Sequence, residues 1–313
     1  MLSLANVTEE GNLPSTIRLR VLSLGAGVQS TTLALMAAHG EIGPMPDCAI
    51  FADTGWEPNS VYDHLDWLRS PNVLPFPVHL VSAGNIREQL MAAGEGNRWA
   101  SIPAFARTVT PAGSKVPVCD KDGEGDLVQV STRRTNRETV SIGMIRRQCT
   151  TDFKIVPIRR KVRKLAGLTR KRSPTHAIVE QWIGISRDEI IRVKPSREAW
   201  QINRWPLIEK RMNRRECLAW LRRHDYPEPP KSACIGCPFH DNARWRAMRD
   251  HDPEAWTDAV EIDRAIRTGL RGIRGEVFLY RSAVPLEEAD LSTAADRGQL
   301  DLWPNECEGM CGV

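Results

Sequence analysis

Residues 21–30, VLSLGAGVQS, decide the fold of this chain. An apolar stretch runs into a glycine-rich turn, and STTLALMAAH (30–39) follows with the pattern of a helix. Glycines let the backbone turn sharply and approach an anion, and the first amides of a helix bind phosphate oxygens. The same strand, turn and helix also form without a ligand, so both interpretations stay open. The candidate phosphate-binding residues are Ser23, Gly25, Ala26, Gly27, Gln29, Ser30 and Thr31.

The loop differs from two common nucleotide motifs. No GK[ST] closes it, so it is not a Walker A loop, and Ser30 stands where a dinucleotide motif has its third glycine. Strand patterns at 17–24, 48–52, 78–81 and 176–185 alternate with helical patterns at 30–39, 59–69, 86–93 and 151–165. This alternation predicts an α/β fold, with an open parallel five-stranded sheet and helices on both faces.

The rest of the chain predicts three parts. Residues 1–16 are expected to be a leader, 17–210 the nucleotide-binding α/β domain, and 211–313 a helical, cysteine-rich C-terminal region. Asn213 is the expected N-cap of an amphipathic helix. The stretch 94–144 is rich in Gly, Pro, Ser, Thr and Arg and has weak periodicity, so we expect an irregular flap there.

Polar residues follow two of the predicted strands. In an open parallel sheet ligands bind beyond the carboxyl ends of the strands, so Asp53, Thr54 and Gly55 are expected to face the same crevice as the loop. Asp53 is the candidate catalytic carboxylate, and its alternative role is to form a turn before glycine. Ser186 and Arg192 follow the later strand and are candidates for binding nucleotide or magnesium, or for capping a helix.

Composition indicates a globular protein with an uneven charge distribution. No apolar run is long enough to span a bilayer, and the first residues lack a secretory signal, so we expect a cytoplasmic protein with no membrane partner. The segment from Arg133 to Arg172 carries 14 Lys and Arg against two acids, within a net charge of +4 for the chain. Such a basic block favours a nucleic acid backbone or nucleotide phosphates, although a solvated helix face has the same composition.

Cysteines supply the second kind of motif. SACIGCPFH contains a CxxC pair, Cys234 and Cys237, whose spacing lets two thiolates bind one metal site. Cys149 lies among basic residues that favour its thiolate form. Cys307 and Cys311 lie in the tail, and either is a candidate fourth ligand. Zinc held by thiolates is the alternative to an iron–sulfur cluster.

Together these motifs resemble the PP-loop superfamily of adenine-nucleotide α-hydrolases, and within it the phosphoadenosine phosphosulfate (PAPS) reductase-like branch. GAGVQST (25–31) resembles the SGGxDS loop of that superfamily, with Gly25 for the serine, Ala26 for a glycine and Gln29 for the aspartate. FADTGWEP (51–58) is similar to the DTG-x-x-x-E element of the branch, with its acid placed early. The resemblance covers most of residues 18–311 and implies ATP or another adenine nucleotide, with Mg²⁺, reacting at the α-phosphate.

The cysteines carry the same resemblance. QCTTDFKIVPIRR (148–160) resembles the Cys-Cys-x-x-(R/K)-K-x-x-P-(L/I) segment of iron–sulfur adenylylsulfate reductases, with Gln148 in place of the first cysteine. This implies a [4Fe–4S] cluster on Cys149, Cys234 and Cys237, with Cys311 or Cys307 as fourth ligand, or with one iron left free for a sulfide. The Glu306-Cys307 step resembles the ECG element that carries a nucleophilic cysteine in sulfonucleotide reductases.

Three functions follow as expectations. The first is a nucleotide-dependent sulfur transfer to a nucleic acid or nucleotide, through adenylation and sulfur insertion, supplied by a thiol or sulfide donor. The second is the reduction of a sulfonucleotide by Cys307, with release of sulfite. The third is a cluster-stabilised module that binds nucleic acid without turnover.

Overall fold

The computed structural model describes residues 16–97, 102–121, 126–293 and 295–298, which fold into two compact units. The first unit contains the described residues up to 86, residues 148–235 and the described residues from 293 onward. The second unit contains residues 87–147 and 236–292, with the same gaps in its description. The predicted parts, 17–210 and 211–313, are each continuous in sequence, whereas each of these units combines separate segments of the chain. The predicted division therefore stays a prediction. Of the predicted leader, all but residue 16 lies outside the described residues.

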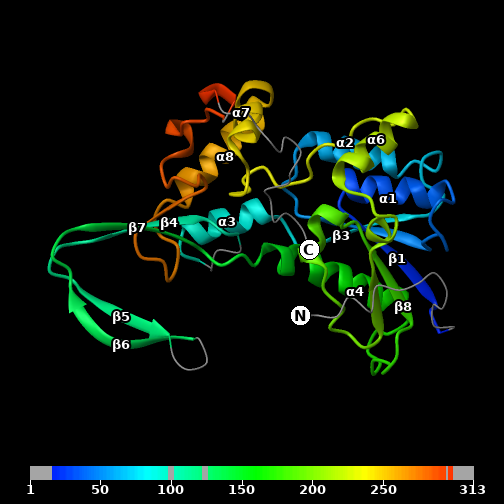
Figure 1. Cartoon of the computed structure of the whole chain (residues 1–313), viewed down its shortest axis with the longest axis horizontal. Helices are drawn as coiled ribbons and strands as arrows, with labels where there is room; N and C mark the ends of the chain where they lie inside the picture. Colours follow the sequence, from blue (N-terminus) through cyan, green and yellow to red (C-terminus); the bar gives the residue numbers. More distant parts are fainter. Residues whose placement is uncertain (1–15, 98–101, 122–125, 294, 299–313) are drawn as a thin grey trace. The chain divides into compact units, whose positions relative to one another are not determined.

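A sheet of five parallel strands forms the centre of the first unit, in the order β3-β2-β1-β8-β9, and confirms the predicted fold class (Figure 1). The fifth strand is β9, for which the sequence had indicated no position. The strands are β1 (Leu19–Leu24), β2 (Cys48–Asp53), β3 (Val78–Ser82), β8 (Val179–Ile183) and β9 (Gln201–Arg204).

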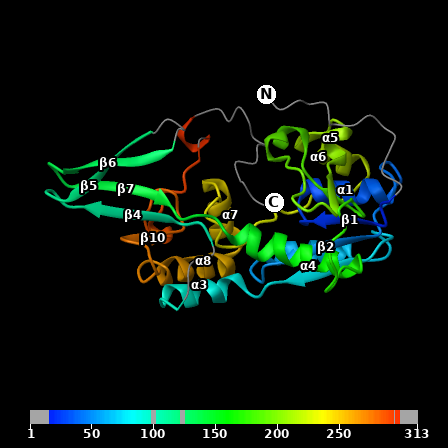
Figure 2. The same ribbon diagram turned by 90° about the horizontal axis from the view of Figure 1, so that it is seen from below.

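Apolar side chains of β1 alternate between two cores, one on each face of the sheet. Leu22 and Leu24 belong to a cluster that includes α1, α2 and α6, whereas Val21 belongs to a cluster that includes Val162 of α4. Figure 2 shows α4 on the opposite side of these strands from α1 and α6. Parallel strands that are buried on both faces carry near-continuous apolar runs, and these runs allowed the strands to be predicted from the sequence. The helices are α1 (Val28–Ala38), α2 (Asn59–Leu68), α4 (Val156–Leu165), α5 (Pro206–Glu209) and α6 (Arg214–Arg223).

Short helical turns and a cap complete the first unit. A π-helical turn covers Thr150–Ile155, and 3₁₀ turns cover Arg187–Arg192 and Ala295–Arg297. The Asn213 side chain accepts a hydrogen bond from the Glu216 amide at 2.8 Å, and the Glu216 carboxylate accepts one from the Asn213 amide at 2.7 Å. This reciprocal capping box confirms the predicted start of α6.

Four strands occupy the stretch where an irregular flap was expected, so that expectation was wrong. They are β4 (Phe105–Thr110), β5 (Lys115–Lys121), β6 (Leu127–Arg134) and β7 (Thr139–Met144). Strand β4 pairs antiparallel with β7 and with β10 (Glu276–Phe278), and β5 pairs antiparallel with β6. Every residue of β6 and β7 is exposed. Strand β7, TVSIGM, alternates polar and apolar residues, so the strand pattern was present, but the Gly, Pro, Ser, Thr and Arg content of the whole stretch outweighed it.

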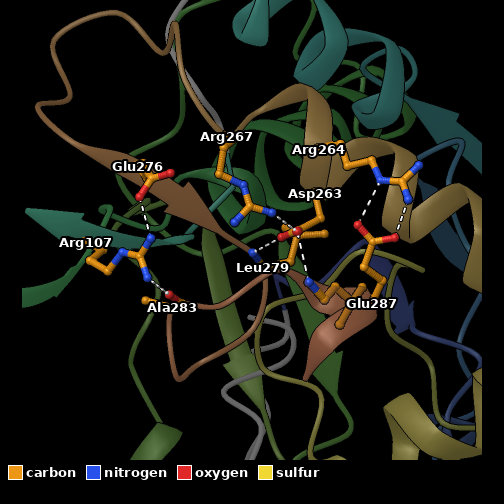
Figure 3. A network of polar contacts seen from close by, with 9 residues as sticks. Arg107, Asp263, Arg264, Arg267, Glu276, Leu279, Ala283 and Glu287 are labelled. Carbon is orange, nitrogen blue, oxygen red and sulfur yellow. Dashed lines mark hydrogen bonds and ion pairs between the residues drawn. The ribbon is translucent and has the colours of Figure 1, made fainter. Parts of the chain in front are cut away.

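A buried carboxylate holds β10 against a helix in the second unit (Figure 3). Asp263 of α8 accepts hydrogen bonds from the amides of Leu279 at 2.7 Å and Leu286 at 3.1 Å, and it forms an ion pair with Arg267. Burial raises the pKa of Asp263, while these donors oppose the shift. The helices of this unit are α3 (Ile86–Gly94), whose first residue closes the first unit, α7 (Asn242–His251) and α8 (Pro253–Ala265), with a 3₁₀ turn at Leu286–Glu288.

The buried sheet predicts a large difference between two isoleucines of the first unit. Ile50 of β2 is 0% exposed and Ile191 is 91% exposed. We expect Ile50→Ala to lower the free energy of unfolding by about 2–5 kcal/mol, because it removes buried methyl and methylene groups and leaves a cavity. Ile191→Ala should change it by less than about 0.5 kcal/mol. Urea unfolding followed by tryptophan fluorescence measures both, and equal losses would contradict the burial of β2 within the sheet.

Candidate functional site

The order of the strands creates a switch point at the carboxyl ends of β1 and β8. From β1 the chain passes through α1 to β2 on one side, while β8 lies on the other side. The two loops meet closely there, since a Cβ added to Gly184 would lie 2.9 Å from the backbone of Ser30. Ligands of open parallel sheets bind at such points. The arrangement therefore marks this edge of the first unit as the candidate site.

The loop between β1 and α1 presents backbone amides. Ala26 has a φ of 54°, and Gly27 is an extended N-cap that supplies no side-chain hydrogen bond to the helix. The Ser30 hydroxyl accepts from the Gly25 amide at 3.1 Å and donates to the Gly27 carbonyl at 3.3 Å, which fixes the turn. The first amides of a helix have no intrahelical acceptor, so this end of α1 suits an anion.

Two other candidate hydroxyls are committed to neighbours. The Thr31 hydroxyl is buried and lies 3.0 Å from Nε2 of His64, whose pKa burial lowers to about 4. The Ser23 hydroxyl accepts from the Gln181 side chain at 2.5 Å. In the described geometry Thr31 therefore stabilises the helix core, and Ser23 joins β1 to β8.

Gln29 connects the loop to the segment after β8. Its Nε2 atom lies 3.4 Å from the Ser186 hydroxyl and 3.4 Å from a Glu189 oxygen, and its Oε1 atom accepts from Arg214 at 3.2 Å. Glu189 also forms an ion pair with Arg192. The structure thus brings the predicted Gln29, Ser186 and Arg192 together. It adds Glu189 and Arg214, which sequence spacing gave no means of linking to Gln29.

Asp53 forms the turn at the end of β2. Its Oδ1 atom accepts from the Gly55 amide at 2.7 Å and from the Tyr62 hydroxyl at 2.9 Å. Gly55 has a φ of 70°, a conformation that glycine adopts without strain. Burial raises the pKa of Tyr62, so its hydroxyl keeps the proton that it donates to Asp53. Asp53 therefore forms the turn, as its alternative role predicted. The two donors hold its Oδ1 atom in a fixed position.

A thiol lies at the end of the same strand. Sγ of Cys234 is 3.2 Å from the Thr54 hydroxyl and 3.6 Å from Oε1 of Glu57. The Thr54 hydroxyl donates to the same Glu57 oxygen at 3.1 Å, and Nζ of Lys154 lies 3.8 Å from it. Glu57 is 3% exposed, and its second oxygen, Oε2, is buried and has no hydrogen-bond partner among the residues that the structure describes.

The segment that carries Cys234 also passes the phosphate-binding loop. The Ile235 amide donates to the Trp56 carbonyl at 2.9 Å, which ties this segment to the residues after β2. A Cβ added to Gly27 would lie 3.5 Å from the side chain of Ser232. One short segment, 232–235, therefore contacts both the loop after β1 and the turn after β2.

Cys149 is the second thiol of this region. It is the N-cap of the π-helical turn that also carries Lys154, and such turns are frequent at functional sites. Burial raises the pKa of the Cys234 thiol, the charges of Glu57 and Cys149 raise it further, and Lys154 lowers it. The sequence had indicated both cysteines, and both belong to the first unit.

The proposed grouping of the remaining cysteines with Cys149 and Cys234 stays a prediction. Cys237 belongs to the second unit, where its carbonyl accepts from the His240 amide at 3.1 Å. Cys307 and Cys311 lie outside the described residues. Within the part of the chain that the structure describes, no three His, Cys, Asp or Glu residues form a group that could hold a metal ion. Cys48 and Cys217 are buried, as expected of core residues.

The basic block is divided between the two units at residue 147. On α4, Arg163 is committed to Ser173, to the Leu168 carbonyl and to the ring of Trp200, whereas Arg160 and Lys164 are exposed.

Among the helices of the described ranges, none is long and apolar enough to cross a membrane. The chain matches no protein-family model and no curated protein.

The charges around Cys234 predict opposite effects of two substitutions in metal-free protein. Glu57→Gln removes a charge that raises the thiol pKa, so Cys234 should be alkylated faster at constant, mildly alkaline pH. Lys154→Met removes a charge that lowers the pKa, so alkylation should be slower. Below the pKa, one unit changes the thiolate fraction about tenfold. Mass spectrometry measures both rates against the exposed Cys119, and changes in the same direction would refute the assignment.

Proposed function

We propose that the chain is an adenine-nucleotide-dependent sulfur-transfer enzyme whose site is the carboxyl edge of the first unit's sheet. The observation that carries this proposal is the position of Cys234, 3.2 Å from the Thr54 hydroxyl, on a segment that also lies against Gly27 of the loop. A thiol-bearing segment and a helix terminus suited to an anion therefore share one edge. A reaction that involves both a nucleotide phosphate and a sulfur atom needs an anion-binding group and a thiol at the same place.

The nucleotide phosphates would occupy the turn from Gly25 to Gln29. Backbone amides at the start of α1 stabilise negative charge, and the partial positive charge of the helix terminus adds to them. Gln29 and Arg192 supply polar groups beside the turn, and the second carboxylate oxygen of Asp53 is the candidate ligand of a magnesium ion. Thr31 and Ser23, with their hydroxyls engaged, contribute by holding the loop.

The proposed reaction has two steps. An oxygen of the acceptor attacks the α-phosphate, the bond to the β-phosphate breaks, and pyrophosphate leaves. A sulfur nucleophile then attacks the atom that carried this oxygen, and AMP leaves with the oxygen. Glu57 Oε1, 3.6 Å from Sγ of Cys234, is placed to accept the thiol proton, and Lys154 would compensate the carboxylate charge.

An iron–sulfur cluster is part of the proposal. The donor chemistry fits in part: Cys149 and Cys234 are soft ligands of the same unit, and a bound cation would offset the burial that keeps the Cys234 thiol protonated. Cys149, Cys234 and Cys237 would hold the cluster, with Cys311 or Cys307 as fourth ligand, and zinc is the alternative metal. When bound, the cluster would supply a place for the sulfide that is transferred.

The acceptor is proposed to be a nucleic acid. Its support is the exposed basic surface of the first unit formed by Arg160, Lys164, Arg170, Lys171 and Arg172. These side chains suit a phosphate backbone, for which affinity falls steeply as salt rises. Cytoplasmic location fits this substrate and the use of free thiols, and it stays part of the proposal.

Turnover tests the proposed function. Anaerobic protein with iron, sulfide, ATP and nucleic acid should release AMP and pyrophosphate only when all components are present. We expect Cys234→Ser to lower the rate by at least about a hundredfold, because the cluster that holds the sulfide would lose a ligand, while ATP binding stays within about threefold. Cys119→Ser, at an exposed thiol of the second unit, is the matched control and should keep full activity.

Two outcomes would replace the proposal by its alternatives. Thiol-dependent sulfite release from PAPS or adenylylsulfate, lost in Cys307→Ser, would assign the chain as a sulfonucleotide reductase. Salt-dependent binding of nucleic acid, without turnover of any of these nucleotides, would assign it as a binding module.

A further inference from the structure

Two partly buried arginines of the second unit, Arg147 and Arg244, lack the acidic partners that other arginines of this unit have. Figure 3 shows the usual arrangement, in which Arg107 pairs with Glu276. Arg147 and Arg244 form no ion pair and no side-chain hydrogen bond with any residue that the structure describes, and the Nε atom of each is buried. A buried charge without a partner costs free energy, so these two side chains point to an anion from outside the fold.

Arg244 is the third residue of α7, a position that disfavours a positive charge. The N-cap of this helix is Asp241, whose carboxylate accepts from the Arg244 amide at 2.6 Å. The first turn of α7 holds no acid, and the partial positive charge of the helix start repels the guanidinium. Burial lowers the pKa of Arg244, while the charges of Asp241 and Asp252 raise it. Both acids cap helices, and neither forms an ion pair with Arg244.

The next residue of the same turn carries a further donor. Trp245 is 0% exposed, and its Nε1 atom is buried with no acceptor in the described part of the chain. Its ring meets the ring of His240, the residue before the N-cap, edge to face with 4.8 Å between the ring centroids. Contact between these two positions fixes the direction from which the chain enters a helix. The start of α7 is therefore a fixed turn on which two adjacent residues carry donors without acceptors.

Arg147 reaches this turn from another part of the chain. Its guanidinium carbon lies 5.5 Å from the centre of the Phe239 ring. Phe239 directly precedes His240, so the segment 239–245 contacts Arg147 through its first residue and carries Arg244 near its other end. Because this segment turns directly into α7, the two guanidinium groups belong to one small region of the second unit.

We propose that the start of α7 binds a phosphate group through Arg147 and Arg244. A guanidinium group can donate two parallel hydrogen bonds to phosphate oxygens, which makes arginine a common phosphate-binding residue. Bound phosphate would supply acceptors and negative charge to two side chains that have neither, and the partial exposure of both arginines leaves access for it. The site lies in the second unit and is independent of the sulfur chemistry proposed for the first.

Arginine modification tests the site directly. Phenylglyoxal reacts with guanidinium groups, and peptide mass spectrometry follows each arginine of the full chain separately. With inorganic phosphate at about ten times its dissociation constant, modification of Arg147 and Arg244 should be about tenfold slower than in sodium chloride of equal ionic strength, because a bound ligand protects by the factor 1 + [L]/Kd. Arg249, exposed on the last turn of α7, is the matched control and should react equally in both salts. Equal rates at Arg244 in both salts overturn the proposal.

Two further arms of this experiment identify the source of the phosphate. Protection by a single-stranded oligonucleotide, at a concentration at least about a hundredfold below that of inorganic phosphate, would assign the site to a nucleic acid backbone, and this protection should weaken steeply as salt rises. Protection by inorganic phosphate and by AMP at similar concentrations, without an advantage for the oligonucleotide, would assign the site to free phosphate or a mononucleotide.

Melting temperatures separate phosphate binding from a structural role. Arg244→Met keeps a long side chain and removes the charge, so in phosphate-free buffer this variant should melt at or above the temperature of the unmodified chain. Phosphate should raise the melting temperature of the unmodified chain more than that of Arg244→Met, whereas Arg249→Met, on the same helix, should keep the full shift. If Arg244→Met melts well below Arg249→Met without phosphate, Arg244 has a packing role and the proposal is overturned.

Discussion

The parallel pairing of β1 with β2 on one side and β8 on the other is the constraint on which the first unit depends. It sends three loops to one edge of the sheet. The close approach of Gly184 to Ser30 permits no side chain between two of these loops. The backbone bond from Ile235 to Trp56 then fixes the cysteine-bearing segment to the third. Packing at the edge of the sheet, rather than sequence proximity, brings a thiol to the start of α1.

Two buried carboxylates show how a structural acid differs from a candidate functional one. In the second unit both oxygens of Asp263 are occupied by amides and by Arg267, so its burial is compensated within the fold. Glu57 in the first unit leaves Oε2 buried without a hydrogen-bond partner in the described part of the chain. An unsatisfied buried polar group costs about 1–3 kcal/mol, and more when it is charged. A cost of this kind beside Cys234 is typical of a site that is completed by a ligand or a metal.

Sequence alone predicted the sheet because its strands are buried on both faces and carry strong apolar runs, as β1 and β2 do. It also predicted the cap at Asn213, which depends on residues three apart. It missed the four strands from β4 to β7, because the composition of the stretch outweighed the alternation in strands such as β7. The neighbours Thr54 and Cys234 are 180 residues apart, and Gln29 and Arg214 are 185 apart. Their contacts arise from tertiary packing, which no local pattern encodes.

The central claim is that the thiols of the first unit and a bound nucleotide occupy the same edge of the sheet. Alkylation of metal-free protein with and without saturating ATP tests it directly, with each cysteine followed by mass spectrometry. The account predicts that ATP slows the modification of Cys234 and Cys149 by about tenfold or more, as expected when a bound ligand excludes reagent, and leaves Cys119 unchanged. Equal alkylation rates at Cys234 with and without bound ATP would show that the thiol and the nucleotide do not share a site, and would contradict the account.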